Sequence, residues 1–434
     1  MELQNRIESR TATVAVIGLG YVGLPLVAEM AKAGFPTIGI DLRADRVDAV
    51  NRGESYIEDV PTEELRSLVE AGKVRATDDY SVLSEADCVS ICVPTPLRTG
   101  TKEPDVSYII SAAEQIASFI HREMLIVLES TTYPGTTDEV ILPMLEGVGL
   151  RAGADFCLAF SPERVDPGNP TFRTGNIPKV VGGITPLCTQ TACAFYGAIT
   201  SEVVAVSDTR AAETVKLLEN TFRSVNIALA NEMALLCRKL GIDVWEVVRG
   251  AASKPFGFMP FYPGPGLGGH CIPIDPYYLT WKARLQGFDA KFIDLAGEIN
   301  GAMPSVVRQI VADALNDCGK PIKGSRILVL GVAYKKDVSD SRESPAVEVI
   351  TLLRERGGDV VYHDPYVPEL SENGLRMRSV DLSDEALSSA DCVVIATAHT
   401  CFNYEGIIDL AALVVDTRNA TGEAGTRAEH VVKL

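Results

Sequence analysis

One cysteine, Cys271, follows a histidine at the end of an unusual loop. Seven of the eleven residues before this His-Cys pair are glycine or proline, so the segment 256–271 cannot form a regular helix or strand. A cysteine there is poorly placed to fill a core. It is well placed to be a nucleophile, provided that nearby positive charge stabilises its thiolate. The alternative interpretation is an inert cysteine packed in a loop.

Three polar residues lie at helical spacing on a long apolar-periodic segment upstream of that loop. Lys216, Asn220 and Arg223 are separated by four and three positions, which places them on one face of a helix. A lysine beside an asparagine can donate hydrogen bonds to a developing oxyanion. A solvated helix face is the alternative, and spacing alone favours it.

A glycine-rich turn near the beginning of the chain predicts a dinucleotide site. The segment Gly18-Leu-Gly20-Tyr21-Val22-Gly23 follows an apolar strand and opens a helix, and Asp41 ends the next strand about twenty residues on. Such a turn admits a pyrophosphate, and the carboxylate holds ribose hydroxyls and repels a 2′-phosphate, which favours NAD over NADP. An ordinary glycine turn is the alternative. Two further candidates for the same cleft are Arg46 and Thr95.

A second turn of this kind has lysines where the first has glycines. After Gly331 the chain reads Val-Ala-Tyr334-Lys335-Lys336, and Arg342 follows. Without the later glycines this turn cannot admit a dinucleotide in the usual way, but its lysines can clamp phosphates by charge. We expect at least Lys335 to contact a ligand.

The bulk composition limits the function classes. The net charge is −18, which argues against a nucleic acid or an anionic membrane as partner. The first residues contain no apolar core of signal-peptide length, and no apolar run approaches the length of a membrane span, so we expect neither feature. Ten scattered cysteines without a CxxC pair indicate reduced thiols, most of them in the core, in a cytoplasmic protein with no metal site.

The surrounding periodicity predicts the elements that position these residues. Short apolar runs alternate with helical patterns in the first and last thirds, which is typical of parallel doubly wound sheets. We predict an α/β protein with two doubly wound, Rossmann-like domains joined by a helical central domain. The predicted domains are 1–206, which carries the NAD site, 207–305, which carries the cysteine loop and a dimer interface, and 306–434, which carries the lysine turn. A long helix from about Thr209 would bridge the domains or form a dimer interface.

Several of these motifs together resemble the UDP-glucose/GDP-mannose dehydrogenase family. They span nearly the whole chain in the family's order. The loop that leads into Cys271 is similar in particular to the UDP-N-acetylglucosamine 6-dehydrogenase branch. The motifs are the glycine turn at 18–25, Ser161-Pro-Glu163-Arg164, Lys216-x3-Asn220, Gly268-Gly-His-Cys-Ile-Pro-Ile-Asp275, and Tyr334-Lys-Lys-Asp with Arg342-Glu-Ser.

The resemblance implies a four-electron oxidation of a C6 alcohol that uses NAD twice. Cys271 would capture the intermediate aldehyde as a thiohemiacetal, and the resulting thioester would be hydrolysed to a uronate. Lys216 and Asn220 match the family's oxyanion donors. Asp275 matches the residue that positions water, with Thr131 nearby, and Glu163 matches the carboxylate used in hydrolysis.

The resemblance also assigns binding residues. Arg342 and Thr131 would contact the cofactor, beside the glycine-turn residues. The nucleotide sugar would contact Glu163, Arg164, Lys216, Asn220, Arg223, Lys254, Phe261, Tyr262, Gly268, Tyr334 and Lys335. The predicted substrate is UDP-N-acetylglucosamine, with UDP-N-acetylmannosamine and UDP-glucose as alternatives.

Two other function classes remain open at this point. A catalytically silent sugar-nucleotide-binding protein would be expected to have lost some of Lys216, Asn220, Cys271 and Asp275, all of which are present. A two-electron dehydrogenase of the 6-phosphogluconate type would have no use for Cys271. Both expectations favour the enzyme, and the long helix favours a homodimer or a higher homo-oligomer.

Overall fold

The computed structural model describes residues 2–98, 103–166, 169, 171–172, 174–269, 272–372 and 374–434. Its contacts divide the chain into two compact units. Unit 1 comprises Met1–Glu219 and Tyr277–Phe288, and unit 2 comprises Asn220–Pro276 and Asp289–Leu434. The segment 207–305, predicted as a helical central domain, is shared between these units, and its independence stays a prediction.

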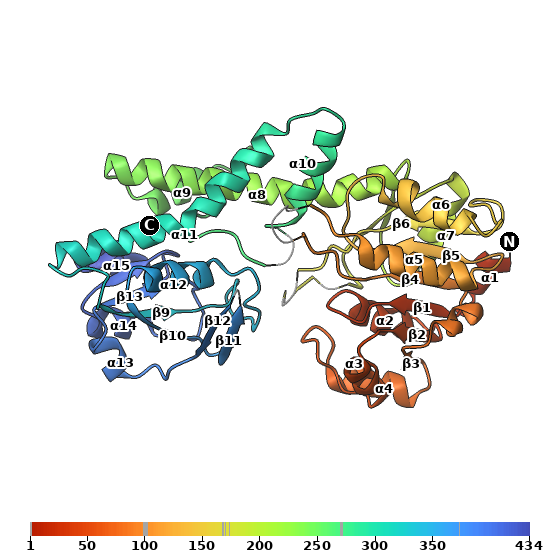
Figure 1. Ribbon diagram of the computed structural model, residues 1–434, viewed down its shortest axis with the longest axis horizontal. Helices are drawn as coiled ribbons and strands as arrows, with labels where there is room; N and C mark the ends of the chain where they lie inside the picture. Colours follow the sequence, from red (N-terminus) through yellow and green to blue (C-terminus); the bar gives the residue numbers. More distant parts are fainter. Residues whose placement is uncertain are drawn as a thin grey trace. The chain divides into compact units, whose positions relative to one another are not determined.

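Unit 1 is built on an eight-stranded sheet (Figure 1). Across the sheet the strands are β3 (Val74–Thr77), β2 (Thr37–Ile40), β1 (Val14–Ile17), β4 (Cys88–Ile91), β5 (Leu125–Leu128), β6 (Cys157–Phe160), β7 (Lys179–Gly183) and β8 (Val203–Ala205).

The sheet was predicted to be parallel, but β6 and β7 are antiparallel. A parallel pair needs a crossover of a dozen or more residues, usually a helix. No helix lies in the described part of the β6–β7 connection, so the chain turns back.

Both faces of this sheet are covered, because its strands alternate core residues between them. Val14 and Val16 pack with one set of helices, and Ala15 and Ile17 pack with the other. The first set is α1 (Glu2–Glu8), α2 (Gly23–Lys32), α3 (Ala44–Asn51), α4 (Thr62–Glu70) and α7 (Pro186–Tyr196); the second is η1 (Tyr80–Glu85), α5 (Ser107–Phe119), η2 (Thr137–Ile141) and α6 (Leu142–Glu146).

Unit 2 repeats the doubly wound plan on a smaller scale. Its parallel sheet has the order β10 (Asp359–His363), β9 (Arg326–Leu330), β13 (Cys392–Ile395), β14 (Val414–Asp416) and β15 (Val431–Lys433), beside a hairpin of β11 (Glu369–Glu372) and β12 (Leu375–Arg378). One face packs on α9 (Val244–Ala252), α11 (Lys291–Asp317) and α12 (Pro345–Glu355), and the other on α13 (Asp384–Ser388) and α14 (Tyr404–Leu410); α15 (Gly422–Arg427) precedes β15. The two sheets confirm the predicted fold class.

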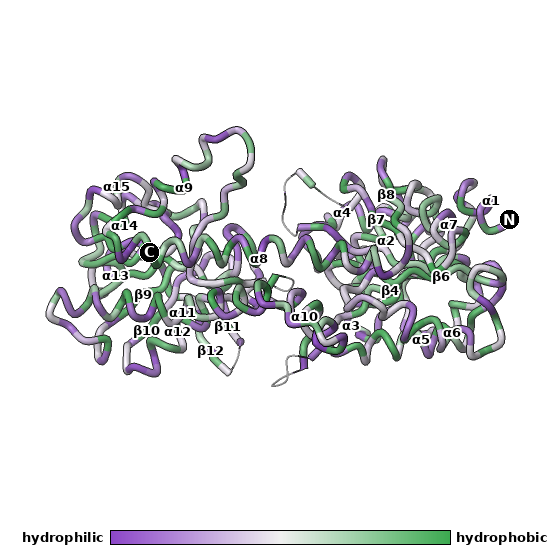
Figure 2. The backbone as a smooth tube through the Cα atoms, turned by 90° about the horizontal axis from the view of Figure 1, so that it is seen from above, coloured by the Kyte–Doolittle hydropathy of each residue, from purple (hydrophilic) through white to green (hydrophobic). Residues whose placement is uncertain are grey.

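The long helix α8 (Thr209–Leu240) contains no glycine or proline, which explains its uninterrupted length. Figure 2 shows hydrophilic and hydrophobic residues interspersed along it. The loop after α9 stays irregular through its described residues until α10 (Asp275–Leu285), as its glycines and prolines predict. No helix in the described ranges is both long and apolar enough to cross a membrane.

Most of the described cysteines are core residues, as predicted. Those buried with free thiols are Cys88, Cys92, Cys157, Cys188, Cys237 and Cys392. Cys318 and Cys401 are exposed. Cys271 lies outside the described residues.

Candidate functional site

The glycine turn lies between β1 and α2 in unit 1, and its geometry fits a dinucleotide. Gly18 has φ +94°, and a Cβ there would lie 2.6 Å from the carbonyl oxygen of Cys92. A Cβ on Gly23 would overlap the Gly18 carbonyl oxygen at 1.8 Å. A Cβ on Gly20 would meet no atom within 4 Å, so the backbone at Gly20 lies open. An open backbone at a helix N-terminus is the cradle that a pyrophosphate requires.

Asp41 is buried directly beside this turn. Its carboxylate accepts hydrogen bonds from the backbone N–H of Leu19 (2.8 Å) and of Arg43 (2.9 Å) and from Arg46 Nη1 (3.2 Å). The predicted cofactor residues Asp41 and Arg46 are therefore brought together as an ion pair. Tyr56, which the sequence did not single out, donates its hydroxyl to the Leu19 carbonyl at 2.7 Å and further fixes the turn.

The other predicted cofactor residues of unit 1 follow the central strands. The carbonyl of Thr95, just after β4, accepts a hydrogen bond from the buried Tyr278 hydroxyl at 2.6 Å. Thr131, just after β5, is half-buried, and Tyr21 in the glycine turn is 44% exposed. Both threonines therefore lie beyond the carboxyl ends of parallel strands, where ligands of such sheets bind.

Glu163 lies in the β6–β7 connection and is held by backbone and by charge. It accepts the N–H groups of Arg164 and Val165, both at 2.7 Å, and its second oxygen lies 3.3 Å from Lys179 Nζ. Burial alone would raise the pKa of Glu163, but Lys179, the two N–H donors and Lys216 together lower it. Its neighbour Arg164 forms an ion pair with Glu219 at 2.6 Å.

The predicted polar face of α8 carries buried side chains, which excludes a solvated helix face. Lys216 is 6% exposed and Asn220 is fully buried. In unit 2 the Asn220 amide donates a hydrogen bond to Asp275, and its oxygen accepts one from Arg223 Nη2. The structure thus brings Asp275 together with two residues that the sequence had grouped on one helix face.

The described residues on the amino side of Cys271 pack tightly within unit 2. A Cβ on Gly268 or Gly269 would lie 2.8 Å from side-chain atoms of Tyr334, so only glycine allows this close approach. The N–H of Gly269 donates to the Arg342 carbonyl at 3.3 Å, and that of Gly264 donates to Asn231 Oδ1 at 2.9 Å. The glycines therefore seat the cysteine loop against the turn that follows β9.

In that turn, as in the turn after β1, backbone N–H groups donate hydrogen bonds to an aspartate at the end of the neighbouring strand. Asp364, at the end of β10, accepts the N–H groups of Val332 and Ala333, as Asp41 accepts that of Leu19. Here the carboxylate also accepts a hydrogen bond from His399 Nε2 (3.0 Å). The predicted ligand residues Tyr334 and Lys335 are half-buried on this turn.

A pocket of about 460 Å³ in unit 2 carries Lys336 of the lysine turn and two arginines that the sequence analysis did not assign. Its lining residues are Trp245, Arg249, Tyr262, Pro263, Lys336, Arg418 and Asn419. Tyr262 stacks on Trp245 with ring centroids 6.0 Å apart. Burial lowers the pKa of the Arg418 guanidinium to about 10, and no carboxylate in the described part of the chain forms an ion pair with it. Arg418 follows β14, at the edge of the sheet where ligands bind in such folds, which is the signal that could have found it.

The other predicted substrate residues of unit 2 are not among these lining residues. Phe261 packs edge-on against Phe222, with centroids 5.7 Å apart. Lys254 is exposed with its Nζ 5.0 Å from the centre of the Phe256 ring. Arg342, which was predicted to contact the cofactor, forms an ion pair with Asp340 at 2.6 Å. Of these predicted residues, only Tyr262 lines the cationic pocket.

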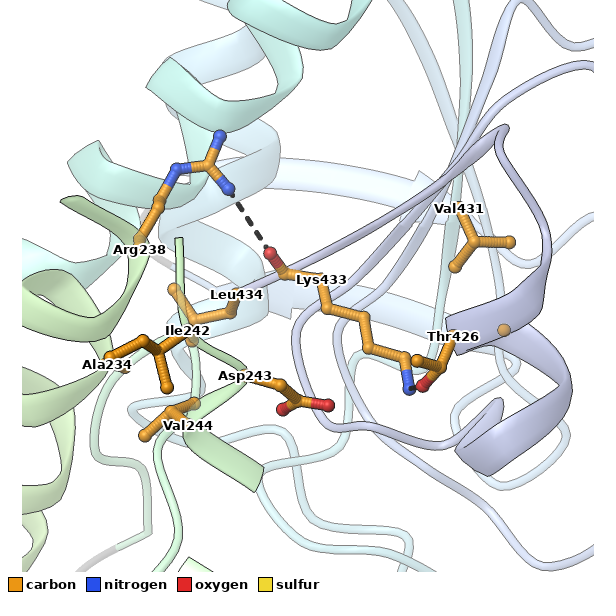
Figure 3. A pocket seen from close by; sticks show the side chains of 10 residues that line it. Ala234, Arg238, Ile242, Asp243, Val244, Thr426, Val431, Lys433 and Leu434 are labelled. Carbon is orange, nitrogen blue, oxygen red and sulfur yellow. Dashed lines mark hydrogen bonds between the residues drawn. The ribbon is translucent and has the colours of Figure 1, made fainter. Parts of the chain in front are cut away.

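A second pocket, of about 230 Å³, lies between the end of α8 and the last strand (Figure 3). Arg238 Nη1 donates to the Lys433 carbonyl at 3.2 Å, and Lys433 Nζ donates to Thr426 Oγ1 at 2.6 Å. None of the predicted site residues lines it. Its volume is below the range of about 300–1,000 Å³ that is usual for ligand sites, so we assign it no ligand. Its two hydrogen bonds hold β15 to α8 and α15.

Three family models match the chain in sequence order. They describe the UDP-glucose/GDP-mannose dehydrogenase family's NAD binding domain (residues 12–200), central domain (210–302) and UDP binding domain (328–423). The UDP-N-acetyl-D-mannosamine dehydrogenase of Escherichia coli K12 is 37% identical over 406 residues, which cover 90% of this chain and 94% of the relative.

Solved structures of nucleotide-sugar dehydrogenases also match this chain over nearly its whole length. A UDP-D-ManNAc dehydrogenase from Pyrococcus horikoshii superposes with a TM-score of 0.88 at 34% identity, over 97% of this chain and 98% of the other. An NDP-N-acetyl-D-galactosaminuronic acid dehydrogenase from Methanosarcina mazei superposes with a TM-score of 0.83 at 30% identity, over 100% of this chain and 97% of the other.

Proposed function

This chain belongs to the UDP-glucose/GDP-mannose dehydrogenase family and is an NAD-dependent nucleotide-sugar dehydrogenase, and from this premise we propose that it oxidises C6 of UDP-N-acetyl-D-mannosamine. The observation that carries the choice of sugar is similarity over nine-tenths of the chain to enzymes named for that substrate. The sequence prediction of UDP-N-acetylglucosamine depended on the loop 253–275 alone. We therefore replace it with the alternative that the full-length comparisons favour.

The proposed chemistry assigns one role to each reactive residue. NAD, when bound at the glycine turn, accepts the electrons removed from C6 in both oxidations. Cys271 adds to the aldehyde, and its sulfur is later the leaving group of a thioester. Lys216 and Asn220 donate hydrogen bonds to the oxyanion. Asp275 orients the attacking water, and Glu163 accepts its proton.

We assign the diphosphate of the substrate to the cationic pocket of unit 2. Arg249, Lys336 and Arg418 all line it in a chain whose net charge is −18. A guanidinium without a carboxylate partner is a strong donor to phosphate oxygens. The paired rings of Trp245 and Tyr262 offer a flat apolar surface suited to a base. Tyr334 and Lys335 remain proposed contacts of the same nucleotide.

We also propose that the protein is a homodimer or a higher homo-oligomer, paired through α8. Exposed apolar side chains recur at intervals of four, seven and seven along this helix, which places them in one stripe. They are Leu218, Phe222, Leu229 and Leu236, each at least 47% exposed. Leu229→Arg would place a charge in the stripe. We expect it to lower the mass measured by sedimentation, and a wild-type protein that sediments as a monomer contradicts the proposal.

The test of the substrate is a comparison of three UDP-sugars at equal concentration. We expect kcat/KM for UDP-N-acetylmannosamine to exceed that for UDP-N-acetylglucosamine by about tenfold to a few hundredfold. The two differ only in the side of the ring that carries the acetamido group, and an amide left without its partner costs about 1–3 kcal/mol. UDP-glucose, which lacks the acetamido group, is the control.

Other outcomes of this comparison are equally informative. Faster oxidation of UDP-N-acetylglucosamine would restore the sequence-based assignment and reject the proposed substrate. Binding of UDP-sugars without any NADH release would favour a silent binding protein. In either case the comparison separates substrate choice from family membership.

A further inference from the structure

A buried lysine lies between two glutamates in unit 1, and none of the predicted roles uses it. Lys179, the first residue of β7, is 3% exposed at its side chain. Its Nζ lies 2.7 Å from Glu129, which follows β5 and is fully buried, and 3.3 Å from Glu163, which is 12% exposed. The three groups form one hydrogen-bonded chain that ends on the carboxylate proposed for hydrolysis.

The far end of this chain is closed by a tyrosine. Tyr196, the last residue of α7, is fully buried and donates its hydroxyl to the second oxygen of Glu129 at 2.6 Å. Lys179 Nζ also lies 5.1 Å from the centre of the Tyr196 ring. Glu129 is thus engaged by Lys179 at one oxygen and by Tyr196 at the other, which holds it in a single orientation.

The charges that face Glu163 come from several elements. They are Lys179 from β7 and Lys216 from α8, with the backbone N–H groups of Arg164 and Val165 in its own loop. Glu129 and the thiol of Cys92 lie around Lys179. Burial alone would lower the pKa of Lys179, but Glu129 and Glu163 raise it, so the lysine keeps its charge.

The burial of three ionisable groups needs a reason beyond stability. Ion pairs in a core lose about as much in desolvation as they gain in attraction, and apolar replacements are often as stable. Glu129 at 2.7 Å already pairs with Lys179. Lys179 also contacts Glu163, which is the most exposed of the three side chains. This second contact therefore connects the buried ion pair to the least buried carboxylate.

We propose that Lys179 and Glu129 are positioning residues that hold Glu163 as an oriented, ionised proton acceptor. Lys179 supplies the positive charge that keeps Glu163 ionised. Glu129 orients the lysine and offsets part of its charge, so Glu163 remains basic enough to take a proton. This inference rests on the proposed function, in which Glu163 accepts a proton during thioester hydrolysis.

The expected signature is a pair of opposite shifts in the acidic limb of the kcat–pH profile. Lys179→Met removes a cation beside Glu163, which raises the pKa of that carboxyl. The limb then moves to higher pH, by about 1–3 units for a partner at this distance. Glu129→Gln removes an anion and leaves Lys179 to act on Glu163 alone. The limb then moves to lower pH. A role in packing alone has no reason to shift the limb in two directions.

The kinetic constants add a second signature. We expect Lys179→Met to lower kcat by up to about 10²-fold, the low end of what a positioned acid–base group contributes. KM should change little, because these residues do not bind the sugar. The shift of the acidic limb and the loss in kcat should both disappear when Lys179→Met is made in a Glu163→Gln background.

The matched control is Lys32→Met. Lys32 also bridges two glutamates, Glu29 at 2.5 Å and Glu64 at 3.1 Å, but it is 39% exposed on α2. Its loss changes the net charge by the same amount, and we expect no shift of the acidic limb. Acidic limbs that are unmoved, or that move in the same direction, in Lys179→Met and Glu129→Gln overturn the inference.

Unfolding measurements keep the inference testable if these variants lose activity. At neutral pH, Lys179→Met leaves Glu163 as a buried charge without its cation, so adding Glu163→Gln should recover part of the lost unfolding temperature. Additive losses in this double-mutant cycle also overturn the inference. The cycle needs no substrate, so its result is independent of the sugar. A wild-type protein that oxidises no UDP-sugar would reject the proposed function instead.

Discussion

Cys271→Ala is expected to abolish uronate formation, with a loss in kcat on the order of 10⁴-fold or more. A thiolate adds readily to an aldehyde and leaves readily from an acyl group, and no other residue assigned to the site combines these properties. The measurement is the amount of uronate formed from UDP-N-acetylmannosamine, determined by mass. Binding of the UDP-sugar should persist, which would show that the variant is folded.

The control for this substitution is Cys401→Ala. Cys401 is exposed in unit 2, and we place it outside the catalytic machinery. We expect it to leave the rate unchanged. Wild-type rates of uronate formation by Cys271→Ala would exclude covalent catalysis by this residue.

Arg418→Met is expected to raise the dissociation constant for UDP about ten- to hundredfold. A hydrogen bond to a charged partner contributes about 1.5–3 kcal/mol. Arg418 lines the pocket in which we place the diphosphate, and its Nε already donates to the Ala396 carbonyl at 3.1 Å. Titration of the protein with UDP measures the effect directly, without turnover.

Two further variants make this result specific. Arg427→Met removes an arginine of the same domain that pairs with Glu423 at the surface, 80% exposed, and should leave UDP affinity unchanged. Lys336→Met tests the same pocket if Arg418→Met does not fold. Unchanged UDP affinity in both Arg418→Met and Lys336→Met would reject the cationic pocket as the binding site of the diphosphate.

The parts of the fold that the sequence predicted are those with local causes. The turn from Gly18 to Gly23 depends on glycines that tolerate close backbone approach, and a strand and a helix flank it directly. The length of α8 follows from a continuous helical period without glycine or proline. Such signals lie within one or two turns of chain and need no tertiary information.

The parts that were missed depend on pairings between distant segments. Lys179 and Glu129 are 50 residues apart, and neither belongs to a recognisable motif. Asn220 and Asp275 were both selected, but their hydrogen bond across 55 residues is visible only in the structure. The antiparallel direction of β7 was also missed. An apolar run predicts a strand but does not show the direction in which that strand pairs with its neighbour.

The choice of sugar is the part of the function that a sequence motif predicts least well. The resemblance of the loop 253–275 favoured one branch of the family, whereas a relative that matches 90% of this chain is named for a different sugar. The configuration at C2 is a small local feature of the substrate. It is recognised by the few groups around that carbon, so a single motif on a shared scaffold is a weak guide to it.

The number of NADH molecules released per UDP-N-acetylmannosamine consumed tests the central claim most directly. The wild-type chain should release two, and its product should have lost two hydrogens and gained one oxygen at C6. Release of one NADH with a free aldehyde as the main product would contradict the four-electron mechanism and the covalent role of Cys271.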